Sequence, residues 1–328
     1  MKIQNYLEKT LDIILWVMLG LFALFVLKNP QVASNGVMNG LHVCIYQLVP
    51  SLFPFMVISN FIIKTNIHKK IGKIMSKPFK KLFKIGENAS GIVILSFFTG
   101  FPVGASMAND LYRRKECTKN EAERLMGFCN NASIVFCLAV LGSGILKDVR
   151  LGIFIYICHI ISAMIVGIIS SKNKKTDFLV KEIYIEKNNM SSMTALVKSI
   201  TESALSMFYV CAFVTFFFAF LNMVDYLSVT SYLNRYFSFS PQVLNCINSV
   251  LFGLVEITNG INMIKSVSPL SIACAGFILS FSGFCILCQC SNFAYDSKLS
   301  MKQYLKSKVL QSVITFILCY LISMIFIF

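Results

Sequence analysis

The chain has 328 residues, of which 56% are hydrophobic and only 14% are charged. Soluble globular domains carry roughly 25% charged residues, so this composition excludes an ordinary soluble protein and indicates that lipid covers much of the surface. The formal net charge of +15 comes from short lysine and arginine clusters between apolar runs. That pattern is typical of cytoplasmic loops of membrane proteins, and we expect its partners to be anionic lipid headgroups rather than nucleic acid.

Seven apolar runs are long enough to cross the bilayer core as helices, which takes roughly 20 residues. In chain order they cover residues 10–27, 40–63, 125–146, 151–170, 200–224, 270–295 and 309–328. The first run resembles a cleaved signal peptide in that Lys2 and Lys9 precede it. Glu8 and Asp12 fit that alternative poorly, so we expect a retained N-terminal transmembrane helix.

Residues 67–84 alternate lysines with large apolar residues. This pattern predicts an amphipathic helix at the membrane surface, broken at Pro78, which would contact anionic lipid.

Two further apolar runs, 89–109 and 242–264, are interrupted. The first contains Gly100, Pro102 and Gly104, and the second contains Glu256 and Gly260. Each interruption leaves two arms of about ten residues, or about 15 Å of helix, which is half of the bilayer core. The runs are therefore either kinked spanning helices or re-entrant hairpins that return to the side they entered from.

The distribution of basic residues favours the hairpins. If both interrupted runs cross the membrane, 17 basic residues lie inside and 13 outside, which is almost no bias. If both are re-entrant, 25 lie inside, four of them in residues 296–308, and five outside. Cytoplasmic loops carry the excess of lysine and arginine, so the hairpin topology is preferred, with a cytoplasmic N-terminus. Loop 110–124 then becomes cytoplasmic, and Cys117 within it offers a labelling test.

This topology divides the chain into two similar units. We expect an N-terminal helix and short loop at 1–39, a first repeat at 40–170, a basic cytoplasmic linker at 171–199 and a second repeat at 200–328. Each repeat crosses the membrane three times, so the second is inverted relative to the first. The predicted fold is an all-α integral membrane bundle of two inverted repeats, each with a broken re-entrant hairpin, an arrangement typical of secondary transporters.

Glu256 is the leading candidate for a site residue, because a carboxylate within an apolar run is costly and marks an ion, proton or substrate site. Thr258, Asn259 and Gly260 follow it directly at the predicted hairpin tip. The alternative is that Glu256 only caps the second arm by accepting backbone N–H bonds. We expect the second arms to begin near Val103 and Ile261 and to point positive helix ends at an anion.

Other polar residues lie where they could face the same region. Asn130 and Asn131 lie inside the 125–146 run, and Ser282 and Gln289 lie in the equivalent run of the second unit. Hydrogen bonding between helices is the alternative role for all four. We expect the single His159 of the 151–170 run to be satisfied by a neighbour rather than to relay protons.

No catalytic, metal or cofactor chemistry is predicted. Eleven of the 12 cysteines lie in apolar segments, whereas a disulfide framework would place them in polar loops. Cys285, Cys288 and Cys290 lie on one predicted helix, which cannot supply a closed metal site, so we expect them to be packing residues. No nucleotide-binding loop or catalytic triad is present, and we predict that the chain is not an enzyme.

Several ordered motifs carry a family resemblance: residues 50–55 (PSLFPF), 100–105 (GFPVGA), 121–125 (EAERL), 128–133 (FCNNAS) and 256–260 (EITNG). Together they resemble the YlbJ family of sporulation integral membrane proteins, within the larger group that carries the nucleoside-recognition Gate domain. Phe101 stands where tyrosine is common in the family, and Ala132-Ser133 stand where Ser-Gly is expected.

The resemblance implies a multi-pass protein of the cell membrane, specifically the mother-cell or outer forespore membrane during sporulation. The function we expect is a transporter or permease for a small polar or anionic solute, with nucleosides and dipicolinate as the solutes suggested by the resemblance. The alternative is a non-transporting membrane scaffold for spore-envelope assembly. A homo-oligomer is compatible with either function.

Overall fold

The computed structural model describes residues 2–172, 190–228 and 239–326, and every regular element in these ranges is a helix. Five helical stretches are long and apolar enough to cross a membrane: Pro30–Lys64, Val149–Ser171, Ser192–Tyr226, Pro269–Asp296 and Met301–Phe326. The predicted all-helical membrane architecture is confirmed at this level. Most of the predicted linker 171–199 lies outside the described residues.

The N-terminal part contains two antiparallel helical rods. Helix α1 (Lys2–Lys28) is followed by α2 (Pro30–Val43), a π-helical turn (Cys44–Leu48) and α3 (Val49–Lys64). Residues 30–39 are therefore helical, and their assignment to a loop was wrong, because a proline at the first helical position is compatible with helix initiation. Pro50 lacks a backbone N–H, which fits the local change from α- to π-helical bonding just before it.

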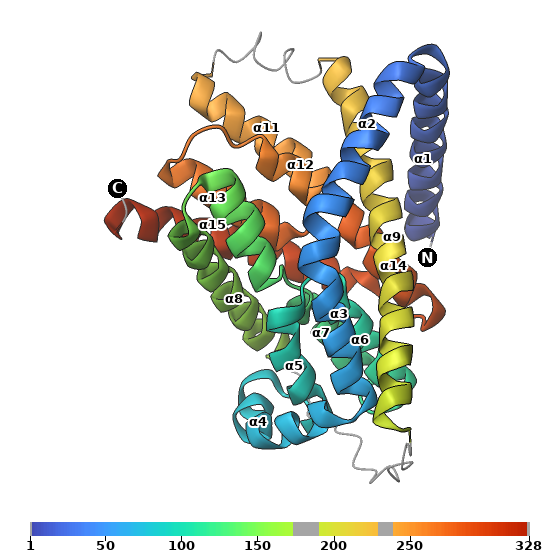
Figure 1. Ribbon diagram of the computed structural model, residues 1–328, viewed down its shortest axis with the longest axis vertical. Coiled ribbons are helices and arrows are strands. Elements are labelled where there is room, and N and C mark those ends of the chain that lie inside the picture. Colours follow the sequence, from blue (N-terminus) through green and yellow to red (C-terminus); the bar gives the residue numbers. More distant parts are fainter. Residues whose placement is uncertain (1, 173–189, 229–238, 327–328) are drawn as a thin grey trace.

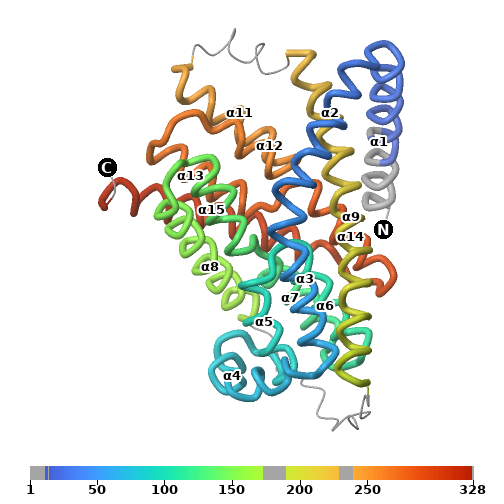
Figure 2. The backbone as a smooth tube through the Cα atoms, in the orientation of Figure 1, coloured from blue at the N-terminus to red at the C-terminus, as the bar shows by residue number. Residues whose placement is uncertain are grey.

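The rod formed by α2 and α3 packs along α9 (Ser192–Tyr226), and the two run in opposite directions (Figures 1 and 2). Glycines permit the close approach. A Cβ at Gly36 would lie 2.8 Å from the Cα of Ala219, and one at Gly40 would lie 2.8 Å from the Cα of Thr215. Small residues at this four-residue spacing are the usual means by which membrane helices bring their backbones together.

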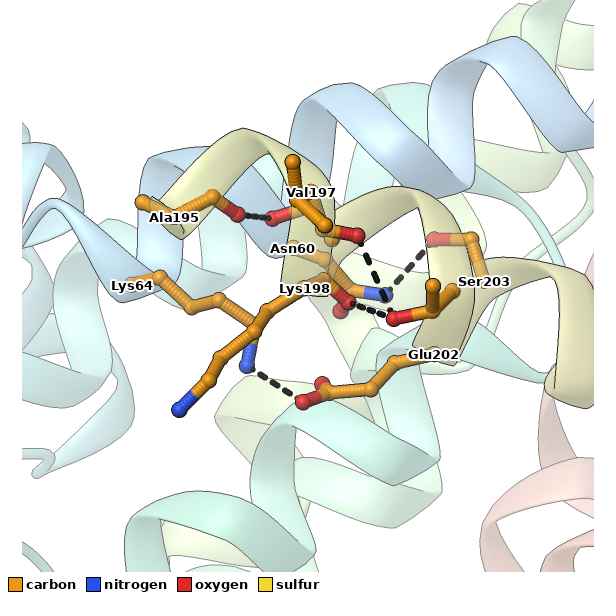
Figure 3. Close-up of polar contacts among 9 residues, drawn as sticks. Asn60, Lys64, Ala195, Val197, Lys198, Glu202 and Ser203 are labelled. Carbon is orange, nitrogen blue, oxygen red and sulfur yellow. Dashed lines mark hydrogen bonds and ion pairs between the residues drawn. The ribbon is translucent and has the colours of Figure 1, made fainter. Parts of the chain in front are cut away.

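Polar contacts join the end of α3 to α9 (Figure 3). The Asn60 side-chain amide donates to the Ser203 hydroxyl at 2.8 Å, and the Lys64 ammonium pairs with the Glu202 carboxylate at 2.8 Å. Glu202 is half exposed, in keeping with its position at the margin of the bundle.

Helix α4 (Ile67–Phe83) lies at this same end of the molecule (Figure 1). It is one uninterrupted helix with Pro78 inside it, so the expected break at Pro78 was wrong. It packs closely on α5 (Glu87–Thr99), since a Cβ at Gly72 would lie 2.3 Å from the carbonyl oxygen of Glu87.

Helices α5 and α6 (Val103–Arg113) are separated by residues 100–102, and the segments that flank them lie together. The Arg124 guanidinium donates to the carbonyl oxygens of Phe83 and Lys84, at 3.0 and 2.8 Å. The Glu121 carboxylate accepts from the Gly86 N–H at 2.6 Å. The chain thus enters α5 and leaves α6 at the same end of the molecule.

Cys117 lies in this contact region and is only 3% exposed. Burial, with the nearby Glu121 and Glu116 carboxylates, raises the pKa of its thiol. It is therefore unsuitable as the labelling site suggested by its polar loop.

A second helical turn-back occurs at Glu256. Helix α11 (Pro241–Val255) is followed by the short α12 (Ile257–Asn262), which folds back along α11. The Ser249 hydroxyl donates to the carbonyl oxygen of Gly260 at 2.7 Å, and a Cβ at Gly260 would lie 2.2 Å from the Cα of Gly253. Two arms of similar length were expected, with the return arm starting near Ile261. The return arm instead starts at Ile257 and spans six residues, because the Glu256 carboxylate caps it there.

Two predicted continuous helices are interrupted. Residues 125–146 divide into α7 (Lys119–Cys129), a non-helical segment at 130–133 and a π-helical stretch (Phe136–Leu146). Residues 270–295 divide into α13 (Pro269–Phe281) and α14 (Gly283–Asp296), where Ser282 and Gly283 have φ of 75° and 65°. Helices α8 (Val149–Ser171) and α15 (Met301–Phe326) follow the two interrupted segments.

Candidate functional site

Four interruptions of the described helices meet around one cavity. These are the tip between α5 and α6, the gap after α7, the turn between α11 and α12, and the break between α13 and α14. Residues at or near each interruption line the cavity: Phe101, Ala132, Ser133, Glu256, Thr258, Cys285 and Gln289. The opposite wall comes from the α2–α3 rod and α9.

The cavity encloses about 50 Å³. A buried water needs roughly 10–15 Å³ of such space, so the cavity has room for a few waters. Ligand pockets are typically roughly 300–1,000 Å³. The site is therefore too small in this conformation for an organic solute and would have to expand to admit one.

Glu256 is the charged residue of the cavity lining. It is 4% exposed, and its carboxylate accepts a hydrogen bond from the Asn259 N–H at 2.7 Å, which caps α12. Both roles expected for Glu256, capping and facing the central region, are thus combined in one side chain. No lysine or arginine of the described residues forms an ion pair with it.

Gln289 gives the cavity an acceptor that lacks a donor. Its side-chain nitrogen contacts the Cys285 sulfur at 3.3 Å, but its oxygen is buried and has no hydrogen-bond partner among the described residues. An unsatisfied buried acceptor costs on the order of 1–3 kcal/mol, so this oxygen favours a bound donor. With Thr258 and Glu256 beside it, the polar side of the cavity is rich in acceptors.

The remaining residues predicted at the two tips serve close packing. A Cβ at Gly100 would lie 2.7 Å from the Ser133 Cβ, and one at Gly104 would lie 2.0 Å from the carbonyl oxygen of Cys129. Gly100 has a φ of 79°, which a residue with a side chain rarely adopts. Gly100 and Gly104 therefore hold the first tip against the end of α7 and the segment after it. Pro102 is the N-cap residue of α6, and Phe101 is the residue that reaches the cavity.

Comparison with known proteins agrees with this architecture. Residues 45–172 match the family described as Gate, nucleoside recognition. It is also 23% identical over 315 residues to the sporulation integral membrane protein YlbJ of Bacillus subtilis (strain 168), a match that covers 88% of this chain and 77% of that protein. The resemblance to the YlbJ family is confirmed, and with its apolar helices the chain is a multi-pass membrane protein. No solved structure matches the chain.

The segment that matches the Gate family contains Asn130 and Asn131, but neither lines the cavity. Their amides face α14 and α15 instead: Asn130 donates to the Tyr304 hydroxyl at 3.0 Å, and Asn131 accepts from the Gln311 amide at 3.0 Å. Asn131 also donates to the carbonyl oxygen of Phe128 at 2.7 Å, which ends α7 locally. The two asparagines do not line this cavity, and the alternative role expected for them, hydrogen bonding between helices, is the one observed. A part in solute binding stays a prediction for both.

Lys308 was not identified as a site residue. It was counted among the lysines of the cytoplasmic loop 296–308, whereas the structure places it inside α15 with no exposed surface. Its ammonium donates to the carbonyl oxygen of Asn130 and to the Gln311 side-chain oxygen at 2.9 Å. A signal was present in the sequence, because Tyr304, Lys308, Gln311 and Thr315 share one face of a helix.

His159 joins three elements within the same polar cluster. The Ala132 N–H donates to its Nε2 at 3.1 Å, and its Nδ1 lies 2.7 Å from the Ser280 hydroxyl oxygen. Because Nε2 accepts, the neutral ring carries its proton on Nδ1 and donates it to Ser280. The prediction that His159 is satisfied by its neighbours is confirmed. Ser282, at the α13–α14 break, has a buried hydroxyl that faces the Tyr304 hydroxyl.

Proposed function

We propose that this protein is a transporter or permease for a small polar or anionic solute, active in the mother-cell or outer forespore membrane of a sporulating cell. The observation that carries the proposal is the convergence of four helix interruptions on one cavity that contains Glu256. Broken helices in a bilayer leave backbone groups unpaired and are tolerated where they line a cavity. Substrate and ion sites of secondary transporters are built in this way.

The sporulation setting comes from the relative, whose printed name is that of a sporulation integral membrane protein. The solute class is informed by the description of the Gate family, nucleoside recognition. The acceptor-rich lining fits a solute with hydrogen-bond donors, or a cation that accompanies it.

We further propose that the two halves are inverted repeats with re-entrant hairpins. The contacts that join the flanks of α5 and α6 support a hairpin that returns to its own side. Helix α4 lies at one end of the molecule and α11 near the opposite end, as inversion requires (Figure 1). These arrangements support a pair of hairpins that enter from opposite faces of the membrane.

Contacts between equivalent helices support the same symmetry. The first helices of the two units run antiparallel, and the Cys44 thiol donates to the carbonyl oxygen of Cys211 at 3.7 Å. The last helices, α8 and α15, meet where Cys158 contacts Cys319 and where the Ser162 and Thr315 hydroxyls lie 2.5 Å apart. Elements that lie on a two-fold axis contact their own equivalents, so both pairs of contacts support a two-fold relation between the halves.

The proposal is tested by solute flux into proteoliposomes that contain the purified full-length chain. Uridine, adenosine and dipicolinate form the first panel, and uptake is measured with and without a sodium or pH gradient. We expect Glu256→Gln to lower the initial rate at least about tenfold, the effect of roughly 1.4 kcal/mol, because the carboxylate faces the site. Glu87→Gln is the matched control, since Glu87 is exposed in the first turn of α5.

Unchanged flux in correctly inserted Glu256→Gln would remove Glu256 from the mechanism. No flux of any solute by the wild-type chain would favour the scaffold function. That alternative predicts that Glu256→Gln leaves sporulation intact, whereas substitutions of the exposed lysines of α4 abolish it.

A further inference from the structure

Lys308 is a fully buried amine without a counterion. None of the ion pairs among the described residues includes it, and Glu256 lines the cavity rather than contacting it. Burial of an unpaired ammonium is among the most costly arrangements in a membrane protein. Such a group is retained where its charge has a function.

The surroundings of Lys308 accommodate both a charged and a neutral amine. Its nitrogen has two acceptors, the carbonyl oxygen of Asn130 and the side-chain oxygen of Gln311. A neutral amine donates two N–H bonds and is satisfied by these two oxygens, whereas an ammonium has a third N–H. Aromatic faces are available to the extra charge, since the ring centroids of Phe101 and Tyr304 lie 5.7 and 5.8 Å from the nitrogen.

The position of Lys308 also favours the charged form in part. Asn130 is the C-cap of α7, an 11-residue helix, and the C-terminal end of a helix attracts a cation. The balance between burial, which opposes the charge, and this helix end, which favours it, makes the protonation state sensitive to a nearby charge.

Phe101 links Lys308 to the candidate solute site. Its side chain lines the cavity that contains Glu256, and its ring also lies over the Lys308 nitrogen. The titratable groups that face Lys308 are Cys129 from α7, Cys290 from α14, His159 from α8 and Tyr304 from α15 itself. No Asp or Glu of the described residues belongs to this group of neighbours of Lys308.

We propose that Lys308 is the proton-carrying group that couples solute movement to a proton gradient; this inference rests on the proposed transport function. A negative charge that enters the cavity next to Phe101 favours the ammonium, and the ammonium favours the anion, because coupling between two sites is reciprocal. Release of the solute then favours loss of the proton. One proton would thus accompany each solute molecule.

The first arm of the test needs no solute. Apparent melting temperatures of the detergent-purified full chain are measured between about pH 5.5 and 8.5 for wild type, Lys308→Met and, as control, Lys306→Met, which lies on the exposed face of α15. An unfolded lysine stays protonated below about pH 10. If folded Lys308 loses its proton in this range, the unfolded state binds more protons and wild-type stability relative to Lys308→Met rises with pH.

The thiols, His159 and Tyr304 remain in both proteins, so the difference isolates Lys308. A difference that stays flat with pH overturns the proposal. If Lys308→Met does not insert, Lys308→Gln replaces it in the same measurement.

The second arm uses dipicolinate, the anion of the panel, at zero membrane potential, because the proposed coupling acts on a negatively charged solute. One-to-one coupling to a gradient of one pH unit supports about tenfold accumulation, since each tenfold ratio corresponds to about 1.4 kcal/mol. We expect Lys308→Met and Lys308→Arg to lose this accumulation, because methionine carries no proton and arginine does not release one. Solute exchange at equal pH remains in at least one of the two variants, and Lys306→Met accumulates solute like wild type.

Accumulation by Lys308→Arg at the wild-type level would overturn the proposal, because a fixed positive charge would then suffice. Absence of flux by wild type together with a pH-dependent stability difference refutes the transport function, and with it the coupling role, but leaves the titration of Lys308 demonstrated.

Discussion

At the scale of single residues, the site depends on polar side chains that hydrogen-bond to backbone groups where a helix is interrupted. Glu256 replaces a backbone acceptor at the start of α12, and Lys308 replaces a donor at the end of α7. Asn131 and Ser133 bond to nearby backbone groups on either side of the gap between α7 and the π-helical stretch. The gap after α7 and the turn before α12 are therefore stabilised by side chains that supply what the missing helical bonds would have supplied.

Glycine substitution at the first tip tests this packing. We expect Gly104→Val to lower the apparent melting temperature of the purified chain, since even a Cβ would lie 2.0 Å from the Cys129 carbonyl oxygen. Forced overpacking typically costs about 1–3 kcal/mol. Gly20→Val in α1 is the control, because no atom lies within 4 Å of a Cβ built there. An equal melting temperature for the two variants would contradict the close approach of α6 to α7.

At the scale of elements, the charge distribution and the observed contacts favour the same arrangement of α5 and α6. The charge count placed loops 64–88 and 110–124 on one side of the membrane, and the Arg124 and Glu121 contacts join these two loops. Two basic residues that the count assigned to cytoplasmic loops are buried. Lys308 lies inside α15, and Arg124 bonds to two carbonyl oxygens. The excess of basic residues on that side persists without them.

Cysteine labelling decides the topology. We expect Lys77→Cys on α4 and Arg114→Cys after α6 to react with an impermeant maleimide only after cells are opened, because both sites are exposed and cytoplasmic in the hairpin topology. Lys147→Cys, exposed in the turn before α8, is expected to react in intact cells. The native Cys117 is buried and adds little background. Reaction of Lys77→Cys and Arg114→Cys from opposite sides would refute a re-entrant α5–α6 pair.

At the scale of the whole molecule, the two halves share their interior. Helix α9 packs along the α2–α3 rod, and α15 contacts both α7 and α8. Leu48 and Leu52 face the cavity from the first half, and Val210 and Val214 face it from the second. The polar cluster around Lys308 is also built from both halves, so neither half encloses the site alone.

Separation of the halves tests this dependence. We expect fragments 1–180 and 181–328 to co-purify when expressed together with a tag on one of them, and each to be unstable when expressed alone. The physical reason is that α15 by itself would present Lys308 and Gln311 to lipid, whereas the complex gives them Asn130 and Asn131 as partners. Stable, monodisperse single fragments would show that each half folds independently.

The sequence by itself determined the class of protein, the approximate membrane segments and the place of Glu256 inside an apolar run, because apolar composition and a carboxylate within an apolar run depend on local residues alone. It also indicated both hairpin tips, since glycine and proline interrupt a helix wherever they occur. Only the tertiary structure decided which polar side chains face the cavity, where α7 and α13 end, and that Lys308 lies inside. Those features depend on which helices pack together: Asn130 could equally face the cavity or α15, and a lysine near a charged loop acquires a buried role only when a distant helix end accepts its hydrogen bonds.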